Sequence, residues 1–573
     1  MPTDRQVTPT RPARRLTLAA AGPVLAILLL AGPVLAGLAG TLLPAFGYLP
    51  ALGGNRFSVA PFTALLSEPG LATSCALSLL TGLAATLIAT LATAAFLAAW
   101  SGTRAFEVLR HILSPLLAIP HAAAAFGLAF LIAPSGWISR LLSPWATGWQ
   151  SPPDAVIIND PAGLSLVAGL LIKEIPFLFL VSLSALPQAN PVRAARLSAG
   201  MGYGRMAGFL LTVWQPVYRQ IRLAVFAVLV FSTSVVDVAA ILGPGTPAPL
   251  AVRLLVWMND PDLAMRFKAS AGAMLQFGLS AFACLLWLAL ERAGAAMLAH
   301  WQRTGWRFER DRAARWASAA LPLSGAAVIF SGMAVLALWS LAGLWQFPDA
   351  WPNELTVRSW MRAMPRLVSP LAVTLAAGLL SAAIATAITV LCLQREEETT
   401  AGHRLLWMIY LPLVVPQAAF LFGLQGLAIG SGLQPGFALL VLAHLVFVLP
   451  YVFLSLSDPW RAWDRRYLAV SAGLGAGASR TFWRIRMPMM MAPVLTAAAV
   501  GFAVSAGLYL PTVLIGAGRV TTITSEAVAL ASGGNRRVIG VYAFLQMGLP
   551  AIGFLIAMSV PALLWRNRRA MKG

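Results

Sequence analysis

Three ionisable side chains lie inside long apolar runs of the sequence. Lys173 and Glu174 are adjacent in LLIKEIPFLF, and Asp237 lies in FSTSVVDVAAIL. A Lys or Asp at the centre of a bilayer costs roughly 2.5 to 3.5 kcal/mol on insertion scales, so such residues usually face a bundle interior or a wet cavity. They could line a path for a solute, or they could brace helices as an ion pair, for example Lys173 with Asp237. Neighbouring residues on a helix point about 100° apart, so Lys173 and Glu174 cannot both face one narrow pore.

Two polar residues each follow a proline in similar apolar segments. His121 lies in IPHAAAAFG and Gln417 lies in VPQAAFLFG. Either residue could contact a solute or gate a path, and an interhelical hydrogen bond is the simpler account of both. With the three ionisable residues they complete the set of candidate pathway residues.

The sequence carries no pattern typical of an enzyme. A phosphate-binding loop needs a Gly-Lys pair, and each of the three lysines follows Ile, Phe or Met instead. No paired carboxylates or nucleophile–base arrangement stands out, and the histidines lack metal-ligand spacing. We therefore expect no catalytic residue, no bound metal and no cofactor on this chain. The cysteines, all within apolar runs, predict neither a disulfide framework nor a metal site: Cys75, Cys284 and Cys392.

Composition places these residues in a membrane protein. The 573 residues are 59% hydrophobic and only 11% charged, with a mean hydropathy of +0.78. Soluble domains carry about 25% charged residues. Apolar runs long enough to cross a bilayer recur along the chain, which predicts an all-α membrane protein with about twelve spans. The expected spans are 17–44, 73–99, 111–132, 164–185, 223–243, 271–290, 318–344, 369–393, 406–430, 436–457, 495–516 and 539–565.

The distribution of basic residues predicts the orientation. With both termini in the cytoplasm, the cytoplasmic segments hold most of the 41 Lys and Arg residues. The first apolar run is too long for the core of a signal peptide, so we expect an uncleaved first span. The net charge of +21 is then a topological bias. No basic soluble domain exists to bind nucleic acid. The expected external loops are 133–163, 244–270 and 517–538.

Matched segments indicate an internal duplication. We expect two homologous six-span halves, 1–295 and 318–573, joined by a basic cytoplasmic linker, 296–317. Since each half has an even number of spans, both halves share one orientation, the parallel-repeat arrangement. The matched pairs are 78–93 with 374–389, 120–128 with 416–424, 198–204 with 471–477, and 275–279 with 545–549.

The least apolar of the matched segments are two long basic loops, 186–222 and 458–494. They contain SAGMGYG and SAGLGAG, and each joins the fourth and fifth spans of its half. The glycines predict a helix–turn–helix. Basic charge alone would fit a topogenic loop, but repetition of the glycine spacing, the loop length and the final proline favours a docking surface. The candidate docking residues are Arg196, Ser198, Gly200, Gly202, Gly204 and Pro216, with Ser471, Gly473, Gly475, Gly477, Ile485 and Pro488.

The second loop resembles the EAA loop of ABC importer permeases. That pattern has Gly, nine residues, and then Ile-x-Leu-Pro; Gly475, Ile485 and Pro488 fit it, with Met487 in place of Leu. The first copy, from Gly202 to Pro216, fits with one extra residue and with Gln215 in place of Leu. The Glu-Ala-Ala triplet is missing: the corresponding positions read around 196–198 and 469–471. The family's Glu-mediated contact with the ATPase therefore has no counterpart here.

The resemblance is strongest to the fused permeases of the iron(III) and thiamine group. It implies the membrane-spanning permease subunit of an ATP-driven importer in the bacterial inner membrane. Such a subunit moves a small hydrophilic solute, thiamine or iron(III) in that group, from a periplasmic binding protein to the cytoplasm. It implies two ATPase subunits that bind the ATP, each engaging one loop, and alternating access of the two halves.

The alternative is an ion-coupled secondary transporter of the major-facilitator kind. Such a protein would be expected to repeat a basic motif between its second and third spans. The segments there, SGTRAFEVLRH and QREEETTAGHR, do not repeat one another.

Overall fold

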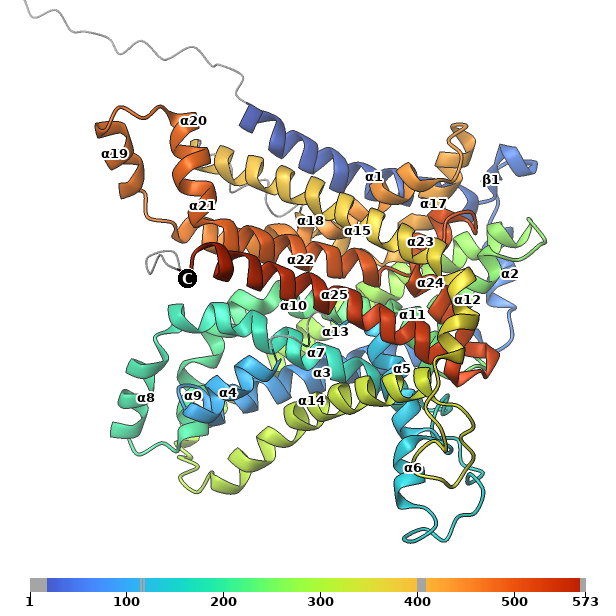
Figure 1. The fold of residues 1–573 in the computed structure, drawn as a ribbon, viewed down its shortest axis with the longest axis horizontal. Coiled ribbons are helices and arrows are strands. Elements are labelled where there is room, and N and C mark those ends of the chain that lie inside the picture. The colour runs from blue at the N-terminus through green and yellow to red at the C-terminus, as the bar shows by residue number, and fades with distance from the viewer. Residues whose placement is uncertain (1–17, 114–115, 117–118, 399–408, 567–573) are drawn as a thin grey trace, which may run out of the picture.

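The computed structural model describes residues 18–113, 116, 119–398 and 409–566, and helices dominate it (Figure 1). Within these residues, ten helices are long and apolar enough to cross a membrane, or eleven if a pair bent by 70°, Ala478–Met489 and Met491–Gly507, counts as one span. The basic segments at both ends of the chain, on which the expected placement of the termini partly depends, lie outside the described residues.

Each of the twelve expected spans contains a helix. Helix α17 by itself has only 14 residues, fewer than the roughly 20 that cross a bilayer, so twelve is an approximate count. In the first half the helices are α1 (Ala21–Ala45), α3 (Leu71–Trp100), α5 (His121–Ile132), α7 (Leu164–Ala185), α10 (Trp214–Ser234) and α13 (Met265–Thr304). In the second half they are α14 (Arg312–Leu341), α15 (Arg358–Glu398), α17 (Gln417–Gly430), α18 (Phe437–Ala462), α22 (Met491–Gly507) and α25 (Arg536–Leu564).

Shorter elements lie between and beside these spans. At the end of the bundle with α2 and α12 is a two-stranded antiparallel sheet, β1 (Tyr48–Leu49) with β2 (Gly54–Asn55). The loops 186–222 and 458–494 lie at the opposite end, where Figure 1 shows α8 and α19. The shorter α-helices of the described residues are α2 (Ala60–Leu66), α4 (Arg104–Leu113), α6 (Trp137–Leu142), α8 (Pro191–Gly200), α9 (Arg205–Thr212), α11 (Asp237–Leu242), α12 (Leu250–Met258), α16 (Leu411–Val414), α19 (Arg466–Gly473), α20 (Ala478–Thr481), α21 (Met487–Met489), α23 (Leu510–Gly516) and α24 (Ile523–Ala529).

The fifth span of each half is broken, although the sequence predicted continuous helices there. In the first half α10 ends at Ser234 and α11 begins at Asp237; in the second, α22 ends at Gly507 and α23 begins at Leu510. The Ser234 hydroxyl donates back to the Val230 carbonyl (2.7 Å), a bond that competes with the helical ladder. In the second half, Pro511 at the second position of α23 restricts the residue before it. Both breaks fall at the same place in the repeat.

A matched hydrogen bond fixes a short helix in each half. The backbone N–H of Leu250, the first residue of α12, donates to Ser78 Oγ at 2.9 Å. In the second half the backbone N–H of Ile523, the first residue of α24, donates to Thr374 Oγ1, also at 2.9 Å. Each hydroxyl satisfies a backbone donor that the short helix leaves free. The duplication therefore extends to individual hydrogen bonds.

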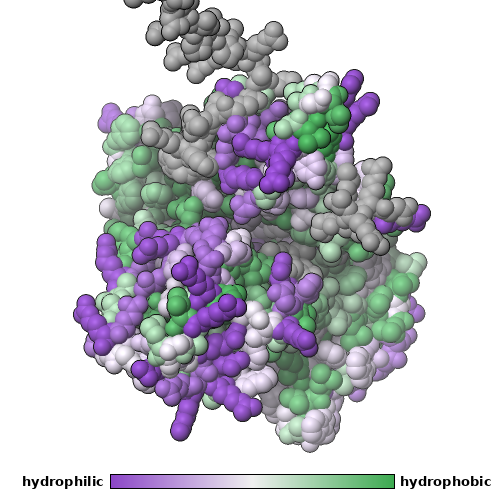
Figure 2. Space-filling view, turned by 90° about the vertical axis from the view of Figure 1, so that its left-hand side faces the viewer, coloured by the Kyte–Doolittle hydropathy of each residue, from purple (hydrophilic) through white to green (hydrophobic). Residues whose placement is uncertain are grey.

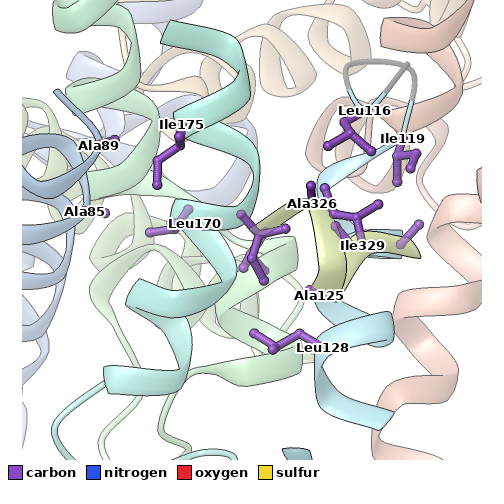
Figure 3. Close-up of a cluster of buried hydrophobic side chains, with 14 of the residues drawn as sticks. Ala85, Ala89, Leu116, Ile119, Ala125, Leu128, Leu170, Ile175, Ala326 and Ile329 are labelled. Carbon is purple, nitrogen blue, oxygen red and sulfur yellow. The ribbon is translucent and has the colours of Figure 1, made fainter. Parts of the chain in front are cut away.

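The two halves exchange their first spans. Helix α1 packs against α17 of the second half, where the backbone N–H of Gly423 donates to Thr41 Oγ1 at 2.8 Å. Helix α14 packs against α5 of the first half, and a Cβ placed on Gly127 or Gly332 would lie 3.0–3.1 Å from the Cα of the other. Small residues allow this close approach of two membrane helices. The buried core of the first half accordingly includes α14 (Figure 3), with Ala85, Ala89, Ala125, Leu128, Leu170, Ile175, Ala326 and Ile329.

Candidate functional site

The first candidate docking loop is a helix–turn–helix, as its glycines predicted. Helix α8 ends at Gly200 and α9 begins at Arg205. Gly202 lies in the turn with a φ of +80°, a conformation that favours glycine. The buried Ser198 accepts a hydrogen bond at its carbonyl from the N–H of Tyr203 (3.0 Å). This bond closes the turn and sets the angle between the two helices.

The second loop repeats this construction. Helix α19 ends at Gly473, Gly475 has a φ of +74°, and the N–H of Ala476 donates to the carbonyl of the buried Ser471 (3.0 Å). The hydroxyl of Ser471 is also hydrogen-bonded to that of Thr481 in α20. The two loops therefore present the same shape at the same end of the molecule.

Each loop exposes a pair of apolar side chains four residues apart, on one face of its first helix. In the first loop Leu197 is 60% and Met201 55% exposed; at the matched places Val470 is 61% and Leu474 82% exposed. Figure 2 shows that hydrophilic side chains gather over this end, with apolar patches among them. Exposed apolar patches with polar rims are typical of surfaces that bind another protein.

The other residues expected in the loops lie on or beside the same helices. Arg196 is exposed on α8. Gly204 and Gly477 directly precede α9 and α20. Pro216 lies in the first turn of α10, and the expected start of that span at 223 is corrected to 214. Ile485 lies in a π-helical turn, Phe482–Arg486, and Pro488 lies in α21, just before the 70° bend into the span.

Arg486 is a structural residue of the second loop that the sequence did not single out. It is 4% exposed, donates two hydrogen bonds to Glu397 in α15 (2.5 and 2.7 Å), and lies 3.9 Å from the ring centroid of Trp460 in α18. A bidentate guanidinium–carboxylate pair is both strong and directional. Arg486 therefore connects the π-helical turn directly to the spans α15 and α18.

A polar cluster lies inside the bundle, among the candidate pathway residues. The Nε2 of His121, at the start of α5, is 3.2 Å from Oε1 of Glu174 in α7, and its ring lies 4.7 Å from that of Phe231. Glu174 is buried, whereas the side chain of His121 keeps 35% of its surface exposed. Lys173, also buried, donates to the Leu116 carbonyl at 2.7 Å. Lys173 and Glu174 therefore point to different partners, as their positions on one helix predicted.

Asp237, the first residue of α11, lies within electrostatic range of His121 and of Tyr509 of the second half. Tyr451 of the second half lies within the same range of Glu174. Two tyrosines of the second half are therefore near the ionisable groups of the first half. The sequence singled out neither tyrosine.

The matched positions in the second half are less polar. Leu510, the first residue of α23, is the counterpart of Asp237, the first residue of α11. Gln417 begins α17 as His121 begins α5, and its side chain is half-buried. Within the described part of the chain, no group of three or more His, Cys, Asp or Glu side chains could hold a metal ion.

Comparison with known proteins agrees with this architecture. No family model matches the chain. The chain is 30% identical over 504 residues to an inner membrane ABC transporter permease, YnjC of Escherichia coli, an alignment covering 88% of this chain and 91% of that protein.

Shorter alignments link the chain to two further permeases. It is 30% identical over 169 residues to the molybdenum transport permease ModB of Mycobacterium tuberculosis, covering 26% of this chain and 63% of ModB. It is 28% identical over 98 residues to the spermidine/putrescine permease PotC of Haemophilus influenzae, covering 17% of this chain and 38% of PotC. With a duplicated all-α membrane fold and a near full-length relative, the chain belongs to the inner-membrane permeases of ABC transporters.

Proposed function

We propose that this chain supplies both permease halves of an ATP-driven importer, and that each of its two loops docks one ATPase subunit. The observation that carries the proposal is the pair of matched helix–turn–helix loops. They share a left-handed glycine, the same turn hydrogen bond and the same exposed apolar pair. Two such surfaces on one chain fit two ATPase subunits, which would bind the ATP. The loops, both termini and the segment between the halves then face the cytoplasm.

The broken fifth spans connect these loops to the polar cluster. In each half, the loop leads directly into the fifth span, α10 or α22. Each of these spans breaks beside the cluster, at Asp237 in the first half and Tyr509 in the second. Closure of the ATPase pair draws the loops together, and the breaks let the inner and outer parts of the spans move separately. This is alternating access by relative movement of two halves.

The polar cluster is the proposed solute path, with His121, Glu174 and Asp237 as its ionisable groups and the ring of Phe231 beside His121. Carboxylates and aromatic rings together suit a cation. The relatives named for molybdenum and for spermidine/putrescine carry solutes of different kinds, so their names do not select one. Of thiamine and iron(III), thiamine agrees better with a cluster in which aromatic rings lie beside the carboxylates. A periplasmic binding protein would deliver the solute to the external segments 133–163, 244–270 and 517–538.

Purification of the tagged chain from its native host in mild detergent tests the proposal, with mass spectrometry of the proteins that remain bound. We expect two ATPase subunits per chain, and ATP-dependent solute uptake once the complex and its binding protein are placed in liposomes. A chain that purifies alone and transports under an ion gradient without ATP would instead be a secondary transporter of the major-facilitator kind.

A further inference from the structure

The segment that connects the halves is bonded to the first docking loop. Helix α13 continues to Thr304 and α14 begins at Arg312, so only residues 305–311, here called the connecting segment, lie between them. The backbone N–H of Gly204 donates to the Arg307 carbonyl at 2.8 Å. The N–H of Met206, in the first turn of α9, donates to Oδ2 of Asp311 at 2.9 Å, and Asp311 is 7% exposed. A carboxylate at this position satisfies a free helix donor and favours the start of α9.

The connecting segment also packs closely on the turn of the first loop. A Cβ on Gly204 would collide with the carbonyl oxygen of Phe308, and one on Gly202 would lie 3.0 Å from Nη1 of Arg307. At the matched places in the second loop, Gly475 and Gly477, a Cβ would meet no heavy atom of the described residues within 4 Å beyond the chain neighbours. The loops share one shape, but within the described residues only the turn of the first loop packs against a segment from outside that loop.

We propose that the connecting segment is part of the first docking surface, an inference that rests on the proposed function. It holds the first loop in its docking shape before the ATPase arrives, and it adds the exposed Arg307 to the surface that one ATPase subunit meets. Arg193 and Arg196 of α8 are exposed on the same loop, so the chemistry of this loop and the connecting segment fits an acidic patch on the ATPase. The other subunit meets a loop whose turn makes no such contact within the described residues.

Asp311 acts in this arrangement as a positioning residue. It does not need to touch the ATPase, because its carboxylate fixes the first turn of α9 from the side. An amide oxygen in place of the carboxylate can still accept from the Met206 N–H, whereas a methyl group cannot. The variants Asp311→Asn and Asp311→Ala therefore separate loss of charge from loss of the hydrogen bond.

Hydrogen exchange in the purified chain without ATPase tests the support directly. We expect amides of residues 201–208 to exchange at least ten-fold more slowly than those of 474–481. Asp311→Ala should remove most of this difference, and Asp311→Asn should keep it. The matched control is Glu309→Ala, which removes an exposed acid from the same segment and should change nothing. Equal exchange in the two loops of the unmodified chain, or a difference that survives Asp311→Ala, would overturn the proposal.

Photo-crosslinking in the assembled transporter tests the surface. Benzoylphenylalanine is placed at Leu197 in the first loop, at Val470 in the second, or at Arg307. We expect all three positions to crosslink to an ATPase subunit. Crosslinks from Leu197 and Val470 without one from Arg307 would overturn this inference and leave the proposed function intact. Crosslinks from none of the three would contradict the docking role of the loops themselves.

Discussion

Replacement of Gly475 by alanine isolates the contribution of one turn conformation to the coupling of ATP hydrolysis with solute transport. Gly475 has a φ of +74°, and a Cβ there would meet no atom within 4 Å in the described residues, so the substitution introduces backbone strain without a clash. A non-glycine residue in the left-handed region costs roughly 1–2 kcal/mol. That strain lowers the population of the native turn relative to alternatives by about 5–30-fold. We expect permease-stimulated ATP hydrolysis and solute uptake to fall several-fold in Gly475→Ala.

The neighbouring Gly473 provides the control for this prediction. It is the last residue of α19, lies outside the left-handed region and has equally open space for a Cβ. Alanine there favours the helix by roughly 0.5–1 kcal/mol and should leave coupling unchanged. Both variants are compared as purified complexes in liposomes, at equal amounts of bound ATPase. If Gly475→Ala hydrolyses ATP and transports as Gly473→Ala does, the turn conformation has no part in coupling.

Three further predictions concern the polar cluster, the second loop and the end of the bundle that holds α2 and α12. Asp237→Asn and Glu174→Gln should each lower uptake about ten-fold at unchanged protein yield; a loss of yield alone would show that these acids only brace helices. Arg486→Met removes the hydrogen bonds to the Glu397 carboxylate and should lower the free energy of unfolding by about 1.5–3 kcal/mol. Denaturant titration measures this change, and an unchanged midpoint would contradict the prediction. Burial opposes ionisation of Glu68, but Lys268 (3.0 Å) and Arg253 outweigh it and hold its pKa below the ordinary 4.5. The ionised Glu68 therefore stabilises the folded chain above about pH 4.5, and this effect is lost as the pH falls through the lower pKa of the folded state. We expect Glu68→Gln to remove this part of the acid sensitivity of the melting temperature. Identical pH profiles of the melting temperature for the two proteins would contradict the prediction.

Features with a local cause were predictable from the sequence. The glycine spacing of the two loops predicted a helix–turn–helix in each, because a residue in the left-handed conformation ends a helix whatever the tertiary contacts around it. The helices α5 and α17 begin directly after the prolines that precede His121 and Gln417, whereas the expected spans 111–132 and 406–430 ran through these prolines. The repeat predicted the pairing of equivalent spans, and the shared hydrogen bonds of Ser78 and Thr374 follow from it.

Contacts between the halves could not be predicted from the sequence. Repeat offsets show which residues are equivalent, but not which residues touch, so Tyr451 and Tyr509 could not be assigned to the cluster. The breaks before Asp237 and Leu510 lie in continuous apolar runs, where hydropathy gives no sign that a helix ends. The bond from the Met206 N–H to Asp311 joins two segments 105 residues apart, and each reads as an ordinary basic cytoplasmic loop.

The exchange of first spans between the halves determines the order in which the helices can pack during synthesis. The N–H of Gly423 that binds Thr41 lies 382 residues further along the chain. At a synthesis rate of about 5–20 residues per second, α1 waits roughly 20–80 seconds for its partner helix. Meanwhile the Thr41 hydroxyl can donate to the carbonyl of Gly37 in its own helix (3.0 Å), so α1 can rest in lipid without an unsatisfied polar group. The ribosome must therefore synthesise the second half as far as α17 before α1 can complete its packing.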